Sequence, residues 1–361
     1  MNITRKVEDS RISEQTYRGL KDRLSYSSIK KFDSDRQAFY KEMVLGEEKE
    51  EKQSTAIIMG HLVHTLLSGM DFDEKFHIAV AAEPKGQMAD LVNNLYNRTL
   101  KSIDKETGMQ TDSFETIFMD AVTATKYDYN MQEVAFKGKD AAKILSMFTG
   151  DAEIYYKEKL LAIGKMVVSV PVVQQAERLV EKIKAHPHSQ YYANVKTDTG
   201  VEVFHELPIL FDIDGVPYKA MVDKVIVDHI DKTIAPIDWK TSWDNENPQQ
   251  SYTKFGYYLQ AAMYNYALTV WAKEHSLEGY QILPMKFIFI DTAGFADPVV
   301  LVLSSNDLRE ARDGFHLRGY KYSGLTELIK QITWHVETGI WSSAMTIAQN
   351  NGEVTLDLNY E

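Results

Sequence analysis

The spacing of apolar residues predicts a first half made mostly of helices. Apolar side chains recur every three or four residues over residues 55–67 and 171–186, as on one face of a helix. Another helix is expected to begin after Ser27 or Ser28, both plausible caps, and to direct apolar side chains toward a core: Ile29, Phe32, Phe39 and Tyr40. Residues 1–23 lack such a period and should form a flexible arm, and the acidic run 47–51 predicts a solvated loop.

Near residue 201 the hydrophobic period changes to the two-residue alternation that is typical of strands. Segments 201–211, 216–227 and 233–239 are rich in β-branched and aromatic residues and are separated by turn-forming residues. We therefore predict three strands in an antiparallel meander. Further along, the pattern predicts a helix, two strands and a helical C-terminal region, over residues 248–273, 285–291, 298–303 and beyond 306.

These elements indicate a mixed α/β protein of the α+β type, with a small mixed sheet flanked by helices and a helix-rich N-terminal half. We expect a single domain over residues 24–361. Its expected parts are N-terminal helices, a helical insertion, the core that contains the strands, and C-terminal helices, over residues 24–80, 85–200, 201–305 and 306–361.

Composition narrows the classes of function. The chain of 361 residues is 44% hydrophobic and 25% charged, as in globular proteins, and it contains no cysteine, which excludes disulfides, cysteine nucleophiles and iron–sulfur clusters. A net charge of −12 argues against a uniformly basic surface that coats nucleic acid, but it allows a basic channel in an acidic body. No apolar run approaches the roughly 20 residues that span a bilayer, and the N-terminus lacks a secretory signal, so we expect a cytoplasmic protein without membrane contact.

The register of the predicted meander brings acidic residues together. If the first turn falls at residues 214–215, Glu206 lies opposite Asp223. The second turn then sets Asp223 opposite Asp238, and two-residue alternation puts Lys240 on the same face. A bulge in either strand would undo this arrangement, because a slip of one residue moves a side chain to the other face.

Three clustered carboxylates repel one another unless a cation neutralises them, so this patch indicates a divalent metal ion. Residues 201–271 contain five basic and ten acidic residues, and phosphate would be repelled there without a metal. Mg²⁺ binds few carboxylates and completes its shell with water and phosphate oxygens, and a nearby lysine can orient that water and offset charge on the phosphate. The alternative is that these are ordinary strand residues facing water, as an isolated Asp-x-Lys sequence usually is.

Short motifs follow one another in order along the chain. Asp223 precedes Ile237-Asp238-Trp239-Lys240-Thr241, and Gln260-Ala261-Ala262-Met263-Tyr264 follows on the next predicted helix. This series resembles the Asp, Asp-x-Lys and Gln-x-x-x-Tyr motifs of the PD-(D/E)XK nuclease superfamily, in its RecB-like branch, although Ile237 stands in place of the proline. Two upstream segments are similar to the opening and the Gly-x-x-x-His motif of the exodeoxyribonuclease VIII (RecE)-like group of phages and prophages: Leu24-Ser25-Tyr26-Ser27-Ser28-Ile29-Lys30 and Met59-Gly60-His61-Leu62-Val63-His64.

The resemblance covers residues 24–80 and 200–291 and implies a restriction-endonuclease-like core. It implies that Asp223 and Asp238 bind the metal and that Lys240 is the catalytic lysine. His64 is implied as a further metal residue, either an additional ligand or a contact to a second metal. The resemblance also implies that Gln260 and Tyr264 lie beside the site and handle the DNA end. Glu206 stands where many relatives carry an acid, so the resemblance implies that it belongs to the catalytic residues as a supporting ligand.

The implied activity is that of a Mg²⁺-dependent exonuclease, with Mn²⁺ able to substitute, which hydrolyses phosphodiester bonds at the ends of double-stranded DNA in phage-type recombination or DNA repair. The resemblance also implies a ring-shaped homo-oligomer, a single-strand annealing protein as partner, and a bacterial host cytoplasm. The alternatives are a structure-specific or endonucleolytic nuclease of the same chemistry, and a non-catalytic DNA-binding or scaffold protein that retains the fold.

Several residues also have a purely structural interpretation. His61 is more readily a core or surface residue than a ligand, and Gln260 and Tyr264 could be only a polar stripe on an apolar helix. A group of aromatic residues could stack on bases but more often packs in a core: Phe255, Tyr257, Tyr258 and Tyr266. Three lysines could contact phosphates or begin a solvated helix: Lys137, Lys139 and Lys143.

Overall fold

The computed structural model describes residues 12, 14–47, 55–104, 106–127, 136–243 and 245–354, so that most of the predicted acidic loop over residues 47–51 lies outside the described residues. The chain forms two compact units. The larger, which we call the sheet unit, consists of Met1–Gly60 and Leu179–Glu361, and the smaller, the helical unit, of His61–Arg178. The predicted insertion over residues 85–200 overlaps the helical unit but does not share its limits. Within the described residues, no helix is both long and apolar enough to cross a membrane.

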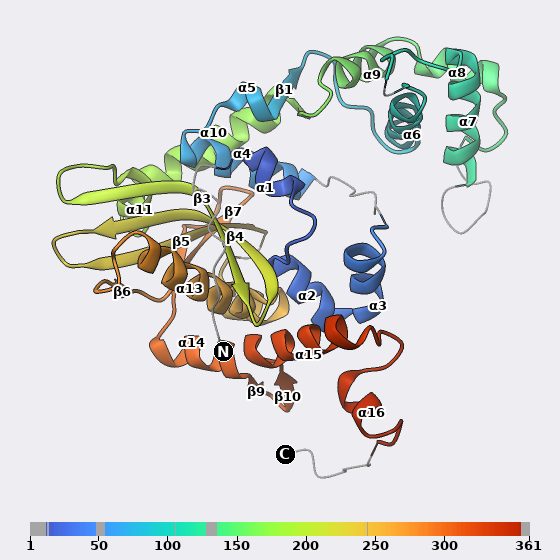
Figure 1. The fold of residues 1–361 in the computed structure, drawn as a ribbon. Coiled ribbons are helices and arrows are strands. Elements are labelled where there is room, and N and C mark those ends of the chain that lie inside the picture. Colours follow the sequence, from blue (N-terminus) through green and yellow to red (C-terminus); the bar gives the residue numbers. More distant parts are fainter. Residues whose placement is uncertain are drawn as a thin grey trace. The chain divides into compact units, whose positions relative to one another are not determined.

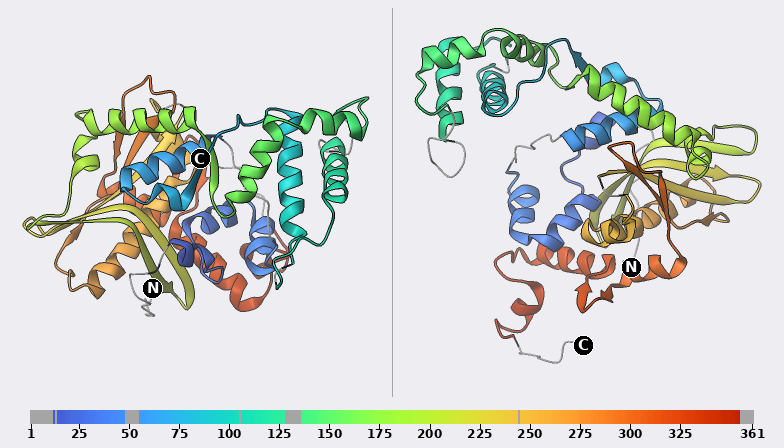
Figure 2. Two further views of the ribbon diagram at one scale, coloured as in Figure 1. Left: turned by 90° about the horizontal axis from the view of Figure 1, so that it is seen from above. Right: turned by 180° about the vertical axis from the view of Figure 1, so that it is seen from behind.

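The sheet unit is built on a mixed six-stranded sheet with the order β3-β4-β5-β7-β8, in which β6 pairs with β5. The predicted meander is confirmed, because β3, β4 and β5 pair antiparallel, whereas β7 pairs parallel with β5 and antiparallel with β8. The long strands β3 and β4 curve past the shorter ones (Figures 1 and 2). The strands are β3 (Val201–Ile213), β4 (Val216–Asp228), β5 (Thr233–Ser242), β6 (Gln281–Ile282), β7 (Lys286–Asp291) and β8 (Val299–Val302).

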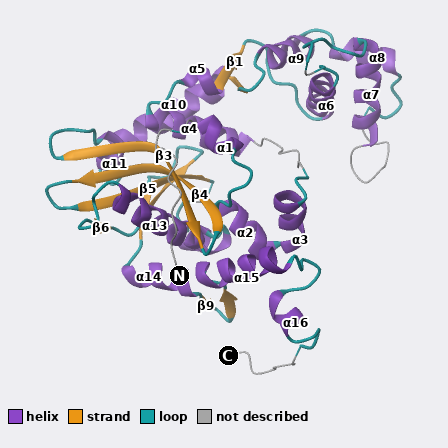
Figure 3. Ribbon diagram, viewed as in Figure 1, coloured by secondary structure: helices purple, strands orange, loops and turns teal. Residues whose placement is uncertain are grey.

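The helix α13 (Tyr257–Glu274) packs on β3 and β4, and α2, α14 and α15 pack on α13 in turn (Figure 3). The apolar side chains between these layers form the main core, to which both the strands and α13 contribute. The other helices of this unit are α1 (Glu14–Gly19), α2 (Tyr26–Ser34), α3 (Arg36–Phe39), the π-helix η1 (Tyr40–Val44), α11 (Gln190–Asn194), α12 (Pro248–Lys254), α14 (Ser305–Asp313), α15 (Leu325–Thr338) and α16 (Met345–Gln349). A short hairpin of β9 (Phe315–Leu317) and β10 (Tyr320–Tyr322), which the sequence did not predict, connects α14 to α15.

The helical unit packs its helices around an aromatic cluster. The rings of Phe118 and Phe148 lie 5.4 Å apart, and Phe148 also contacts Tyr156. The boundary between the units falls inside α4 (Thr55–Ser68) and α10 (Val170–Ala185), two helices that the sequence predicted closely. The remaining elements are α5 (Phe72–Lys75), β1 (Phe76–Ala79), α6 (Gln87–Lys101), α7 (Phe114–Tyr127), α8 (Ala141–Phe148), α9 (Asp151–Leu161) and β2 (Met166–Ser169), and β1 and β2 pair in parallel.

Two predicted helices are divided in the structure. The first begins at Tyr26, not after Ser27 or Ser28, because Ser25 caps it through the backbone N–H of Ser28. It ends at Asp35, which is extended and caps the next helix, α3. The helix predicted over residues 248–273 breaks into α12 and α13 at Gly256, whose φ of +67° lies in the left-handed region that glycine adopts without strain.

The prediction of a flexible N-terminal arm is wrong for residues 14–23. Residues 14–19 form α1, and Lys219 Nζ donates hydrogen bonds to the carbonyl oxygens of Tyr17 and Leu20 at 2.9 and 2.7 Å. Leu24 extends the contact by donating its N–H to the Pro217 carbonyl at 2.9 Å. These bonds fasten the segment to β4 through polar atoms, which a search for apolar periodicity does not detect.

Candidate functional site

The candidate site lies where the backbone pairing between β3, β4 and β5 is interrupted. The predicted first register is confirmed on both sides of Glu206 and Asp223, but this position is missing from the ladder, and Glu206 has a φ of +49°. The second ladder has the predicted register and stops one residue short of Asp223, at the pair Lys224↔Ile237. Asp223 Oδ2 instead accepts the backbone N–H of Trp239 at 3.0 Å. The carboxylate therefore takes the place of a backbone acceptor at the point where the strands separate.

Asp238 lies at the centre of the site. Its side chain is 1% exposed, and its Oδ2 lies 2.6 Å from Lys240 Nζ, whose side chain is 17% exposed. Gln260 Nε2, from α13, donates a hydrogen bond to Asp238 Oδ1 at 2.5 Å. The prediction that Asp238 and Lys240 share a face of β5 is confirmed, and that face is the one covered by α13.

The charges around Lys240 hold its side chain in the ammonium form. Burial alone would lower its pKa, but the carboxylates of Asp238 and Asp223 outweigh burial, so that the pKa of Lys240 is raised. The Nζ also lies 4.5 Å from the centroid of the Tyr257 ring, which offers a cation–π contact. The two aspartates, which are fifteen residues apart in sequence, thus act on one ammonium group.

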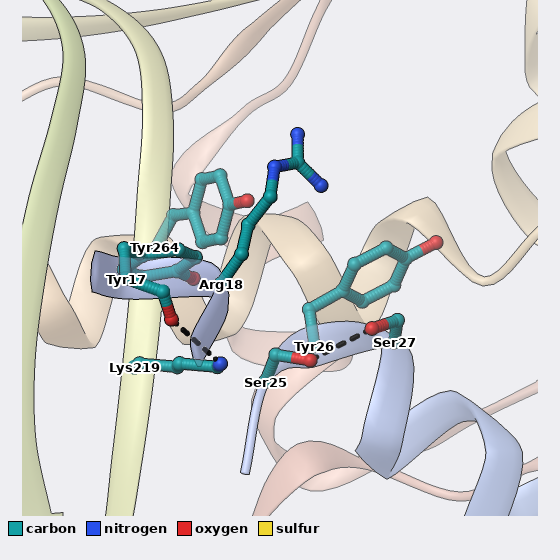
Figure 4. Close-up of a pocket in the computed structure, with 7 residues that line it drawn as sticks. All are labelled: Tyr17, Arg18, Ser25, Tyr26, Ser27, Lys219 and Tyr264. Atoms are coloured by element: carbon teal, nitrogen blue, oxygen red, sulfur yellow. Dashed lines mark hydrogen bonds between the residues drawn. The ribbon is translucent and has the colours of Figure 1, made fainter. Parts of the chain in front are cut away.

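Tyr264 connects this centre to a pocket. Burial, followed by the charges of Tyr17, Asp223 and Asp238, raises the pKa of Tyr264 well above its usual value. The same side chain lines a pocket of about 300 Å³ together with six residues from α1, α2 and β4: Tyr17, Arg18, Ser25, Tyr26, Ser27 and Lys219 (Figure 4). Arg18 and Lys219 bring positive charge to the pocket, and its other lining residues are tyrosines and serines.

The two remaining predicted residues, Glu206 and His64, belong to different units. Glu206 raises the pKa of Tyr17, after burial and the opposing charge of Arg18, so it lies on the side of the site toward α1. His64 belongs to the helical unit, and its role as a metal ligand stays a prediction. Gly60 of the same motif belongs to the sheet unit and approaches β5 so closely that a Cβ there would lie 3.1 Å from Thr241 Oγ1.

The donor set bears on the expected metal. Among the described residues, no three or more His, Asp or Glu side chains are grouped so as to hold a metal ion, and the predicted cluster of three carboxylates is therefore not found as a metal site. Asp223 and Asp238 remain as a pair that acts on one ammonium group. Mg²⁺ is usually bound through one or two carboxylates, with water and substrate phosphate completing its shell, so this pair fits Mg²⁺ better than a cation that needs an all-protein cage.

The sequence assigned neither Tyr257 nor Lys30 to the metal centre, and Tyr257 counted only among the aromatic residues that could stack on bases. Tyr257 lies one turn before Gln260 on α13, and the spacing Tyr257, Gln260, Tyr264 places all three on one helix face, which was a detectable signal. Lys30 follows Tyr26 by one turn on α2, and nothing in the sequence indicates which strand α2 approaches.

No known family model and no curated protein matches this chain. The chain is similar to the crystal structure of a protein from Eubacterium rectale that is provisionally named an exonuclease, with a TM-score of 0.46 and 12% sequence identity over 96% of this chain and 95% of that one. The function assigned to this chain therefore depends on its own residues.

Proposed function

We propose that this chain is a Mg²⁺-dependent nuclease with a PD-(D/E)XK core, which hydrolyses phosphodiester bonds from the ends of double-stranded DNA. The observation that carries the proposal is the convergence on Asp238 of a lysine from its own strand, at 2.6 Å, and a glutamine from α13, at 2.5 Å. Asp223 contributes a second carboxylate from the neighbouring strand. A structural role for so many buried polar groups would be costly, because buried ion pairs seldom add net stability.

Each group has a task in phosphodiester hydrolysis. Asp223 and Asp238 would hold the metal, which when bound supplies an activated water and neutralises charge on the phosphate. Lys240 would offset the negative charge that develops on the phosphate, since it is held as an ammonium group by both carboxylates. Gln260 fixes the orientation of the Asp238 carboxylate through its hydrogen bond.

The pocket beside Tyr264 supports action at a DNA end. Its cationic side chains, Arg18 and Lys219, suit a phosphate group, and Tyr17 and Tyr26 present rings on which a base could stack. A terminal nucleotide placed there would lie next to Tyr264, which senses the charges of both aspartates. We therefore assign Tyr264 and this pocket to the handling of the DNA end.

The test compares digestion of a linear duplex with digestion of a covalently closed circular duplex, each with Mg²⁺ and with EDTA. We expect the linear duplex to be degraded only with Mg²⁺ and the closed circle to persist. Cleavage of the circle would instead support a structure-specific or endonucleolytic nuclease. Binding of DNA without any cleavage would support a scaffold protein and would overturn the proposed activity.

The proposal extends to the biological setting that the motifs suggest. We propose a role in phage-type recombination or DNA repair, in a bacterial cytoplasm, with a single-strand annealing protein as partner and with a ring of identical chains around the duplex. Sedimentation analysis of the purified chain tests the ring, and a monomer at all concentrations would contradict it. Mn²⁺ should replace Mg²⁺ in the digestion assay, because it takes the same oxygen ligands.

A further inference from the structure

The helix α2 brings a second lysine to the site. Tyr26 at its start donates its hydroxyl hydrogen to the Phe255 carbonyl at 2.8 Å, which fixes α2 against the junction of α12 and α13. Lys30, one turn later, has its Nζ 5.7 Å from the centroid of the Phe255 ring. Its aliphatic stem lies along Gly256, where a Cβ would be 3.6 Å from the Lys30 Cγ. The position of the Lys30 ammonium group is thus set by packing on both sides.

Two neighbouring rings connect Lys30 to the catalytic centre. Phe255 and Tyr257 lie 5.7 Å apart between ring centroids, and the second ring carries Lys240 Nζ at 4.5 Å. Partial burial lowers the pKa of Lys30, and the charge of Lys240 lowers it further. Each ammonium group thus lies near one ring of the same neighbouring pair, Lys30 near Phe255 and Lys240 near Tyr257.

The two lysines differ in how their charge is balanced. Lys240 has Asp238 at 2.6 Å and a contribution from Asp223. For Lys30, no carboxylate of the described residues lies within ion-pair distance of the Nζ. Its ammonium group instead makes a cation–π contact with the Phe255 ring. A partly desolvated cation that faces another cation is unfavourable unless an anion reaches both.

We propose that Lys30 binds a backbone phosphate of the DNA strand that enters the site, so that this phosphate lies between Lys30 and Lys240. The inference rests on the proposed nuclease function and adds a residue to its substrate-binding surface. A phosphodiester oxygen accepts charge-assisted hydrogen bonds from lysine, and such contacts fix the position of a strand without regard to its sequence. Lys30 would therefore help to register the scissile phosphate against Asp238 and Lys240.

The chain provides a matched control in Lys254. Its Nζ lies 5.5 Å from the centroid of the same Phe255 ring, so it is a neighbour of Lys30. Unlike Lys30, it is exposed and stands at the last residue of α12. The variants Lys30→Met and Lys254→Met each remove one positive charge from this area and keep most of the stem. Because both variants lose the same charge, a difference in DNA binding between them must come from the position of the lysine.

Binding is measured first, in EDTA, so that no hydrolysis contributes. The fluorescence anisotropy of a labelled short duplex is followed over a range of NaCl concentrations. We expect Lys30→Met to weaken binding and to reduce the slope of log K against log salt by about one, as for the loss of one phosphate contact, whereas Lys254→Met should change the slope by less than half as much. Equal slopes for wild type and Lys30→Met, or equal losses in both variants, would overturn the proposal.

Cleavage is measured second, with Mg²⁺ on a linear duplex. Lys30→Met should lower kcat/KM about tenfold, and Lys30→Arg should restore most of it, because arginine also donates to phosphate. Thermal unfolding followed by circular dichroism separates misfolding from lost contact, and if Lys30→Met does not fold, Lys30→Gln is measured in its place. A wild-type protein that neither binds nor cleaves DNA would refute the proposed function itself. A cleaving wild type with an equally active Lys30→Met would refute only the role of Lys30.

Discussion

At the residue scale, the contacts of Lys240 determine its charge and its position. It contacts Asp238 at 2.6 Å and lies over the Tyr257 ring, and both aspartates raise its pKa. Lys224 is a useful contrast on the adjoining strand: it is 1% exposed, yet its Nζ donates to backbone carbonyls, including that of Tyr192 at 2.6 Å. Lys240 thus contacts a charged group of the site, whereas Lys224 donates hydrogen bonds to carbonyl groups at the end of α11.

Lys240→Met should abolish most of the cleavage while the chain still folds. Groups that offset developing charge are commonly worth about 10²- to 10³-fold in rate. Stability at neutral pH should fall, because Asp238 keeps its hydrogen bond from Gln260 but loses its counter-ion. Initial rates on linear duplex and urea unfolding measure the two effects.

A double variant distinguishes catalysis from stability in this experiment. Lys240→Met combined with Asp238→Asn removes the carboxylate charge that Lys240 contacts, so it should recover stability and remain inactive. Lys240→Met with the wild-type rate would show that the lysine is not part of the chemistry.

Gln260 and Tyr264 should have different effects, although both lie on α13. Gln260→Leu removes the donor to Asp238 Oδ1, so it should raise the Mg²⁺ concentration needed for half-maximal cleavage by about 10- to 100-fold. Tyr264→Phe removes only a hydroxyl beside the pocket, and we expect a higher KM for DNA ends with an unchanged Mg²⁺ requirement. Steady-state kinetics over a Mg²⁺ titration check both. An equal response of the two variants would favour the simple polar stripe that the sequence left open.

At the element scale, the meander could be predicted because its signals are local. The Asp214-Gly215 turn and the alternation along β4 set the register, and the pairs Ile213↔Val216 and Lys224↔Ile237 have the predicted register. The opening of the ladder at Glu206 was not predictable, since a positive φ is uncommon for glutamate and the residue itself gives no sign of it. Gly256 could have indicated the break between α12 and α13, but the apolar pattern on both sides of it favoured one continuous helix.

Lys224 gives a pH-dependent test of the packing of α11 on this sheet. Burial lowers the pKa of Lys224 to about 8, from 10.5 in an exposed lysine. Between these two values the unfolded chain binds the proton and the native chain does not, so the free energy of unfolding should rise with pH. Urea unfolding at pH 7 and pH 10 should show wild type gaining stability relative to Lys224→Met, which has no titrating group there. A relative loss would mean that the hydrogen bonds of the charged form to the carbonyl of Tyr192 outweigh its burial.

At the scale of the whole molecule, the sequence predicted the site residues on the strands but not those that α1 and α2 bring to it. Asp223, Asp238 and Lys240 follow from strand register alone. Lys30, Arg18 and Tyr17 reach the site through α1 and α2, whose docking depends on contacts such as Lys219 with the carbonyl oxygen of Tyr17 at 2.9 Å. Contacts between segments about 200 residues apart leave no periodic trace in the sequence. A chain of net charge −12 can in this way bring several cationic side chains to one region.

Metal binding should appear as a stabilisation of the whole molecule, independently of any cleavage. A ligand that binds only the native state raises the free energy of unfolding by RT ln(1 + [L]/Kd), which is about 2.7 kcal/mol at a hundred times Kd. Mg²⁺ should therefore stabilise the wild-type chain over EDTA, because it relieves the repulsion between Asp223 and Asp238, both of which act on Lys240. Asp238→Asn should lose most of this gain, whereas Lys240→Met should keep it, since the lysine is not a ligand. Urea unfolding over a MgCl₂ series, with NaCl at matched ionic strength as control, measures the effect. An equal gain in wild type and Asp238→Asn would place the metal elsewhere and leave the aspartate pair without its proposed role.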